Sequence, residues 1–314
     1  MFLNLQQTLW PGSTPSLFGG FGAKGNTTDR GVFAVADPSE RMDEAAPTIL
    51  LTNDDGIDTT GFRALYDTLT DIGDVTAVAP DSDKSAVGRA MSSSVSVAEH
   101  ELGYAVAGTP ADCVVAGVEA LVPGVDLVVA GCNDGANLGA YVLGRSGTVS
   151  AAVEAAFFDV PAIAVSMYIP VREDVAFQSI SAEYEAYSEA ARATKYLANH
   201  APEAGVFDHA DYLNVNAPMA GGEHGPLADG EHAPIEITEP STVYQMDAVR
   251  EGDHVQLHDR IWERMADGDI PDLEGTDRRA VVDGKVSVSP LTAPHTTEHH
   301  DALDALAETY PETA

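Results

Sequence analysis

Positively charged residues are scarce in this sequence. It has 16 lysines and arginines against 50 aspartates and glutamates, and its formal net charge is −34. Proteins hold nucleic acid polymers chiefly through lysine and arginine contacts to phosphate. A surface this acidic repels DNA and RNA, which excludes a nucleic acid polymer as the partner. A small phosphorylated ligand fits this charge where a bound metal ion offsets it locally.

The same charge excess indicates the conditions in which the protein folds. Self-repulsion of this size destabilises a compact chain in dilute buffer, but the Debye length shrinks to about 3 Å in 1 M salt. An acidic disordered chain is the alternative, and it does not fit a sequence that is 44% hydrophobic with many short apolar runs. We therefore expect a folded protein from a halophile with a high-salt cytoplasm.

Cysteines and long apolar runs are also few. Cys113 and Cys132 are the two cysteines, and they form neither a Cys-x-x-Cys pair nor part of a cluster with zinc-ligand spacing. No apolar run approaches the roughly 18 residues of a membrane span. These absences exclude a disulfide scaffold and a membrane-spanning protein. They predict a cytoplasmic protein that does not bind a membrane.

The first 41 residues differ in charge from the rest of the chain. They carry three acidic and three basic residues, so the remaining 273 residues carry the whole net charge of −34. They are rich in glycine and lack the charged start and apolar core of a signal peptide. We expect residues 1–46 to be a disordered extension or a mis-assigned start, with Met42 as the true first residue.

From residue 48 onward, short apolar runs alternate with segments of helical periodicity. This alternation predicts a parallel sheet covered on both faces, because strands buried on two sides are continuously apolar. We predict an α/β fold, a three-layer α/β/α sandwich with a mostly parallel, Rossmann-like sheet, as the core over residues 47–220. The predicted strands are 49–52, 75–79, 95–98, 104–107, 126–130 and 162–166, and the helices are 59–71, 110–121, 147–158 and 183–200.

The pattern weakens after residue 217. Apolar runs at 235–238, 242–244 and 285–289 predict short strands. We therefore expect residues 221–291 to form a smaller β-rich C-terminal appendage of the same domain, which takes part in oligomerisation. Residues 292–314 form a polar tail, either as a short helix or without regular structure.

Two adjacent carboxylates follow the first predicted strand, in the loop Asn53–Gly56. In α/β folds, ligands bind outside the carboxyl ends of the strands. Asp54 and Asp55 repel each other unless a cation neutralises them. Gly56 permits the tight turn that lets both carboxylates reach one ion. The alternative is a solvated turn or a cap for the next helix.

Three more polar loops lie at the same predicted edge. Residues 80–89 supply the hydroxyl of Ser85, and residues 131–139 hold Asn133 and Asn137 among glycines. Residues 145–149 precede a helix, where free N–H groups and hydroxyls make an anion site. The alternatives are an exposed loop, a glycine-rich turn and an ordinary helix cap.

Together these loops offer carboxylates, a hydroxyl and amide oxygens beside an anion site. Oxygen ligands favour Mg²⁺, Mn²⁺ or Ca²⁺ over zinc. Such an ion polarises a phosphoryl group and activates a water molecule. We predict one divalent ion per subunit, Mg²⁺ or Mn²⁺ with Ca²⁺ as an alternative, and metal-assisted hydrolysis of a phosphate ester.

These motifs resemble those of the SurE family of survival-protein nucleotidases and phosphatases. Several motifs in the same order are more specific than any one of them. The matching segments are ILLTNDDGIDTTGFRAL (49–65), VAPDSDKSAVGRAMS (78–92), GTPADC (108–113), AGCNDGANLG (130–139), SGTVSAAVEA (146–155), LNVNAP (213–218) and, more weakly, GTDRRAVVDGKVSVSPL (275–291).

The resemblance implies a metal-dependent phosphatase that hydrolyses nucleoside 5′- and 3′-monophosphates with a metal-activated water. It implies a cytosolic homodimer or homotetramer that exchanges C-terminal segments. Asp54 and Asp55 are the expected catalytic residues. The expected metal ligands are Asp54, Asp55, Ser85 and Asn133. The expected phosphate or substrate contacts are Asn53, Asn137, Ser146, Gly147 and Thr148.

Other phosphate-handling proteins fit the sequence less well. A haloacid-dehalogenase-type phosphatase needs two aspartates separated by one residue, whereas Asp54 and Asp55 are adjacent. A phosphoacceptor receiver domain needs a lysine after its fifth strand, where this chain has Met167 and Tyr168. Broader phosphomonoesterase or exopolyphosphatase activity and a non-catalytic metal- or phosphate-binding module are the remaining alternatives.

Overall fold

The structure is a computed structural model that describes residues 46–170, 182–221, 231–297 and 301–309. These residues belong to one compact unit. The expected start at Met42 lies outside them, as does the extension up to residue 45. Within the described ranges, no helix combines the length and apolar character that crossing a membrane requires.

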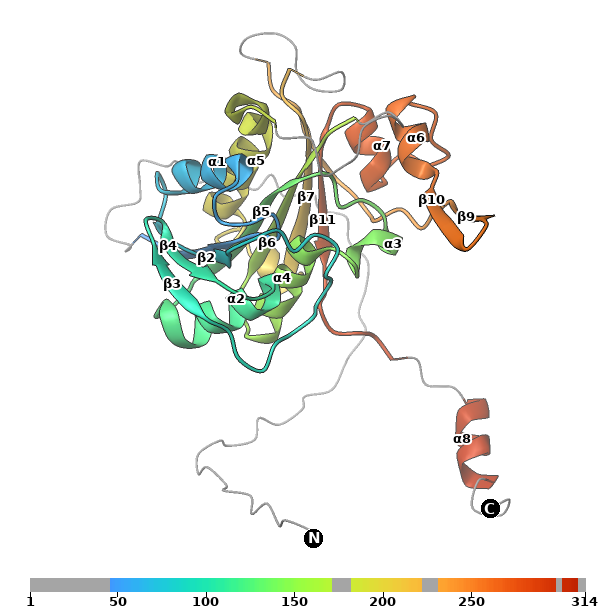
Figure 1. Ribbon diagram of the computed structural model, residues 1–314, viewed down its shortest axis with the longest axis horizontal. Coiled ribbons are helices and arrows are strands. Elements are labelled where there is room, and N and C mark those ends of the chain that lie inside the picture. Colours follow the sequence, from blue (N-terminus) through green and yellow to red (C-terminus); the bar gives the residue numbers. More distant parts are fainter. Residues whose placement is uncertain (1–45, 171–181, 222–230, 298–300, 310–314) are drawn as a thin grey trace, which may run out of the picture. The chain divides into compact units, whose positions relative to one another are not determined.

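A nine-stranded sheet forms the centre of the fold, in the order β3-β4-β2-β1-β5-β6-β7-β11-β8 (Figure 1). The six strands from β4 to β7 run parallel, whereas β3 and β11 run antiparallel to their neighbours β4 and β7. The predicted mostly parallel sheet is therefore confirmed. The strands are β1 (Thr48–Thr52), β2 (Asp74–Pro80), β3 (Val97–His100), β4 (Gly103–Val106), β5 (Leu127–Asp134), β6 (Ala162–Tyr168), β7 (Tyr212–Pro218), β8 (Ile235–Ile237) and β11 (Val286–Leu291).

Helices cover both faces of this sheet, with α1 and α5 on one side and α2 and α4 on the other (Figure 1). Side chains alternate across β1, so Ile49 and Leu51 pack into the core under α1 and α5 while Leu50 packs into the core of α2 and α4. The predicted three-layer sandwich is confirmed. The helices are α1 (Thr60–Leu69), α2 (Pro110–Ala116), α3 (Ala140–Leu143), α4 (Gly147–Phe157), α5 (Ser188–His200), α6 (Ile261–Ala266), α7 (Asp277–Val282) and α8 (Asp301–Thr309), with 3₁₀ turns at Tyr184–Tyr187 and Val206–Asp208 and a π-helix at Gly117–Leu121.

The helices begin where the sequence provides caps. Thr109 and Asp112 form a capping box at the start of α2, with Pro110 in the first turn. Ser146 caps α4 by accepting a hydrogen bond from the backbone N–H of Val149, 3.0 Å away. These caps fix the positions at which the two helices leave the sheet edge.

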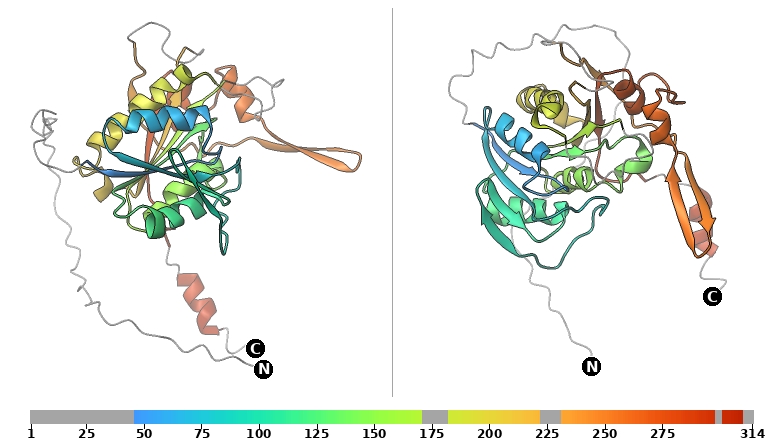
Figure 2. Two further views of the ribbon diagram at one scale, coloured as in Figure 1. Left: turned by 60° about the vertical axis from the view of Figure 1, so that its left-hand side comes forward. Right: turned by 45° about the horizontal axis from the view of Figure 1, so that its top comes forward.

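The C-terminal part divides between the main sheet and a separate hairpin. Strands β8 and β11 join the edge of the main sheet. An antiparallel pair, β9 (Met246–Glu251) and β10 (His254–Asp259), forms a hairpin that extends away from the sheet (Figure 2). This hairpin is not among the elements predicted from the sequence.

The prediction of a strand at 242–244 is wrong. The structure has no strand there, because side chains satisfy the backbone groups of this segment. The N–H of Val243 donates to Ser241 Oγ at 3.1 Å, and its carbonyl accepts from the guanidinium of Arg278 at 2.6 Å. These bonds occupy the groups that a ladder would have used.

Candidate functional site

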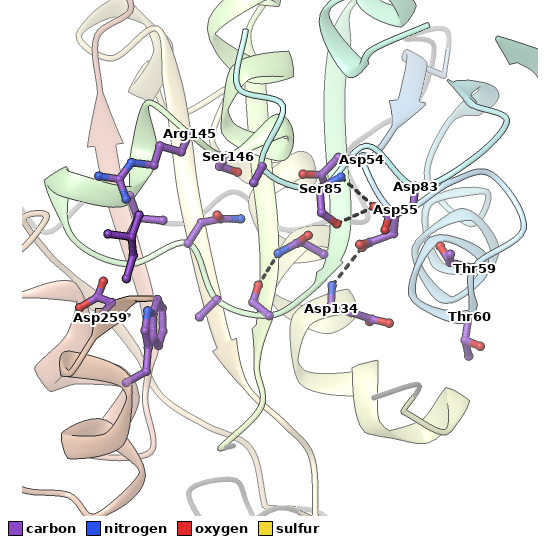
Figure 3. A pocket seen from close by; sticks show the side chains of 18 of the residues that line it. Asp54, Asp55, Thr59, Thr60, Asp83, Ser85, Asp134, Arg145, Ser146 and Asp259 are labelled. Atoms are coloured by element: carbon purple, nitrogen blue, oxygen red, sulfur yellow. Dashed lines mark hydrogen bonds between the residues drawn. The ribbon is translucent and has the colours of Figure 1, made fainter. Parts of the chain in front are cut away.

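A cavity of about 900 Å³ opens at the carboxyl ends of β1, β2 and β5 (Figure 3). The sheet brings together loops that are far apart in the sequence. Six of the nine residues predicted from the sequence line this cavity: Asp54, Asp55, Ser85, Asn133, Asn137 and Ser146. The other three, Asn53, Gly147 and Thr148, lie behind its wall.

Asp54 is held against the first turn of α4. Its two carboxylate oxygens accept hydrogen bonds from the hydroxyl of Thr148 and, at 3.1 Å, from the backbone N–H of Thr148. Asp54 is only 3% exposed. Burial raises the pKa of Asp54, while the bonds from Thr148 oppose the rise. Thr148 therefore orients the carboxylate.

Gly147 is required by the close approach of Asp54. A Cβ atom at residue 147 would lie 2.7 Å from both Cβ and Oδ2 of Asp54. Side-chain atoms do not approach this closely, so a larger residue would push the carboxylate away from α4. The structure thus gives Gly147 a steric role that spacing in the sequence does not reveal.

Because the sequence predicts that Asp54 is catalytic in phosphate ester hydrolysis, we expect Gly147→Ala to lower kcat/KM by about 100-fold or more, the usual effect of displacing a catalytic group by about 1 Å. The overpacked core should also lose about 1–3 kcal/mol of unfolding free energy. Gly144→Ala is the matched control, since a Cβ atom there meets nothing within 4 Å and the φ of Gly144 is −70°. Equal phosphate release by the two variants would contradict the role given to Gly147.

Asp55 lies next to Asp54 and meets the loop after β5. Its Oδ2 accepts a hydrogen bond from the backbone N–H of Asp134 at 3.1 Å. Burial, followed by the charge of Asp54, raises the pKa of Asp55 to about 8. Burial also raises the pKa of Asp134, whose carboxylate accepts a hydrogen bond from the Tyr187 hydroxyl. The site therefore concentrates carboxylates that water solvates poorly.

The donor set of the cavity fits a hard divalent cation. Six aspartates line it, against the single positive side chain of Arg145 among the described lining residues. No three histidine, cysteine, aspartate or glutamate side chains of the described residues are arranged to hold an ion by themselves. A cation here would need neutral oxygens as well, and Ser85 and Asn133 are the lining residues predicted to supply them. The Nδ2 of Asn133 donates to the carbonyl of Gly135, so its amide oxygen is the atom that would act as a ligand.

Asn53 shapes the turn that follows β1. It is fully buried, its Nδ2 donates to the carbonyl of Gly56 at 2.8 Å, and its Oδ1 accepts from the N–H of Gly56 at 3.2 Å. Gly56 has a φ of +111°, which side chains disfavour. Asn53 and Gly56 together curl the chain so that Asp54 and Asp55 both line one cavity.

Asn137 is clamped by buried amides that sequence reasoning missed. The Oδ1 of Asn216 accepts from the backbone N–H of Asn137 at 2.8 Å, and the Nδ2 of Asn214 donates to its carbonyl at 2.9 Å. The Asn137 side chain donates to Ser166 Oγ at 2.9 Å. The segment LNVNAP (213–218) indicates such a role, because two asparagines inside a buried strand need specific hydrogen-bond partners.

A second missed group, at the start of α7, holds the other side of the same loop. The carboxylate of Asp277 accepts from the N–H groups of Gly139 at 2.6 Å and Ser241 at 2.9 Å. The buried guanidinium of Arg278 donates to the carbonyl of Leu138 at 3.3 Å and pairs with buried Asp272 at 3.3 Å. The loop that carries the two predicted asparagines is therefore fixed by β7 and α7 together.

Comparisons of this chain with family models, with known sequences and with solved structures all point to the same family. The family model described as "Survival protein SurE" matches residues 49–245. The protein called 5′-nucleotidase SurE in Haloarcula marismortui is 72% identical over 269 residues, which cover 86% of this chain and 96% of that one. The protein of the same name in Haloquadratum walsbyi is 63% identical, over 84% of this chain and 97% of that one. The crystal structure of the SurE protein from Aquifex aeolicus is 29% identical, with a TM-score of 0.63, and the match covers 85% of this chain and all of that one.

Proposed function

The chain belongs to the SurE family, and we propose that it is a 5′-nucleotidase. It hydrolyses nucleoside 5′-monophosphates, and also 3′-monophosphates, to a nucleoside and phosphate. The name of its relatives at 72% and 63% identity supports the 5′-nucleotidase activity, and the action on 3′-monophosphates rests on the family resemblance alone. The observation that carries it is the adjacent pair of buried Asp54 and half-buried Asp55, which line a cavity that accommodates a small ligand.

Four residues would hold one divalent ion, Mg²⁺ or Mn²⁺ with Ca²⁺ as an alternative: Asp54, Asp55, Ser85 and Asn133. When bound, the ion polarises the phosphoryl group and activates the attacking water. Ser146 lies beside these residues at the positive N-terminal end of α4, which favours a phosphate there. Asn137, clamped from behind, offers its amide to the same region.

Removal of the metal is expected to abolish phosphate release. In molar salt with Mn²⁺ or Mg²⁺, the protein should release phosphate from AMP, and excess EDTA should lower the rate by about 100-fold or more. Added Mn²⁺ should restore it. Circular dichroism before and after EDTA shows whether the fold is intact. The proposal is wrong if no phosphate appears with Mn²⁺, with Mg²⁺ or with the alternative ion Ca²⁺, or if EDTA leaves the rate unchanged.

Two further expectations accompany this function. A homodimer or homotetramer and a cytoplasmic location stay predictions from the family resemblance. Relatives from halophilic archaea support the prediction of a protein that folds in high salt. The experiments on activity and stability therefore belong in molar salt.

A further inference from the structure

The cavity has two ends of different chemistry. One end is built from the loops after β1, β2 and β5 and carries Asp54, Asp55 and Asp83. The other end is built from the hairpin and α6, which contribute Met246, Leu257, Asp259 and Trp262, with Val142 of α3. Figure 3 shows Arg145 and Asp259 across the pocket from Asp55 and Asp83. The ion-binding end and the apolar end are thus parts of one continuous space.

Contacts between aromatic rings and a guanidinium group hold the residues around the apolar end of the cavity in place. The ring of Tyr244, just before β9, stacks on the ring of Tyr141 in α3 with centroids 4.8 Å apart and planes 14° from parallel. The guanidinium of Arg145 lies 3.8 Å from the centroid of the same Tyr141 ring. These contacts fix the base of the hairpin and the Arg145 side chain relative to α3.

Trp262 is also held in position on its inner side. It packs against the buried cluster that contains Leu138 and Met265. Leu257, in contrast, lines the cavity while 70% exposed. Large apolar side chains in this position gain from being covered, because removing apolar surface from water is favourable. Trp262 is therefore packed against the protein on its inner side, and Leu257 is exposed toward the cavity.

We propose that Trp262 and Leu257, with Arg145 beside them, form the subsite for the nucleobase of the substrate. This inference rests on the proposed function. A nucleoside monophosphate matches the two ends of the cavity. Its anionic phosphate would lie at the end expected to bind the ion, and its flat base would lie at the apolar end. Bases stack on aromatic rings and on guanidinium planes. A phosphate or sugar phosphate alone would leave the apolar end unfilled in a cavity of about 900 Å³.

The test compares a nucleotide with the same phosphate ester lacking the base. Phosphate release from AMP and from ribose 5-phosphate is measured in molar salt with Mn²⁺, for the unmodified protein and its variants. Trp262→Ala should raise KM for AMP by about 10-fold or more, and Leu257→Ala by about 3-fold or more. Neither should change kcat/KM for ribose 5-phosphate by more than about 2-fold.

The control is Val255→Ala, which shortens an exposed apolar side chain of β10 that does not line the cavity. It should leave the kinetics of both substrates unchanged. Leu257→Ala keeps the test decisive if Trp262→Ala disturbs packing, because Leu257 is exposed. Equal losses on AMP and ribose 5-phosphate, or no loss on AMP in both variants, would overturn the base subsite and leave the phosphatase function standing. Failure of the unmodified protein to hydrolyse AMP would instead overturn the proposed function.

Discussion

Asp54→Asn and Asp55→Asn should each lower kcat/KM for AMP by about 1,000-fold or more while the protein stays folded. Each change replaces a carboxyl group, which is ionised when it binds a cation, with a neutral amide of the same size. Loss of this charge weakens both ion binding and the charge stabilisation that the ion supplies in the transition state, which is worth several kcal/mol. Phosphate release and calorimetric titration with Mn²⁺ measure the two losses separately.

The fold should survive these changes because of the hydrogen bonds already present. In Asp54→Asn, the amide oxygen can accept from the Thr148 N–H, and the amide NH₂ can donate to the Thr148 hydroxyl, which both donates and accepts. Neutral side chains also avoid burying a charge. We therefore expect the metal-free variants to unfold at the same temperature as the unmodified protein or a higher one.

Asp71→Asn is the matched control for these two variants. Asp71 pairs with Lys195 at the surface and does not line the cavity. The same change of charge there should leave kcat/KM and Mn²⁺ affinity within about 2-fold. Near-normal turnover by both Asp54→Asn and Asp55→Asn would refute the site assignment even if the nucleotidase activity itself is observed.

Arg278→Ala should lower the free energy of unfolding by about 3–5 kcal/mol, the usual result of breaking a buried ion pair from one side. The variant would leave the carboxylate of Asp272 buried without its guanidinium, and it would remove the donor to the carbonyl of Val243. Chemical denaturation in molar salt measures the loss. Arg63→Ala, which breaks an exposed pair with Glu101, should cost about 1 kcal/mol at most.

A double variant separates the ion pair from simple loss of packing. If the unpaired carboxylate causes most of the damage, Arg278→Ala combined with Asp272→Ala should be less destabilised than the sum of the two single variants. Additive losses would show that the pair itself contributes little. Thermal unfolding should rank the variants in the same order.

The core of the fold was predictable because its strands are buried on both sides. β1, β5 and β6 are continuous apolar runs, and the carboxyl ends of parallel strands meet at one edge. That geometry alone brings Asp54, Asp55 and Asn133 to the same cavity. The positions of the metal-ligand candidates in the fold therefore follow from local pattern plus topology.

The rest of the site depends on contacts that periodicity does not encode. The hairpin β9–β10 has no buried face, since Val249, Val255 and Leu257 are all exposed, and it therefore lacks the burial pattern of a core strand. The run at 242–244 contains good strand formers, but side chains of Ser241 and Arg278 bind its backbone. Thr148 and Gly147 act through atoms of Asp54 that only the folded chain brings near them.

The contact between Gly139 and Asp277 joins positions 138 residues apart. A ribosome that adds about 5–20 residues per second therefore needs on the order of 10 s after making the asparagine loop to reach the helix that fixes it. During that interval the nascent chain has its acidic pair and its loop but not the clamp from α7. The loop is thus fixed in place only near the end of translation, after most of the sheet has been synthesised.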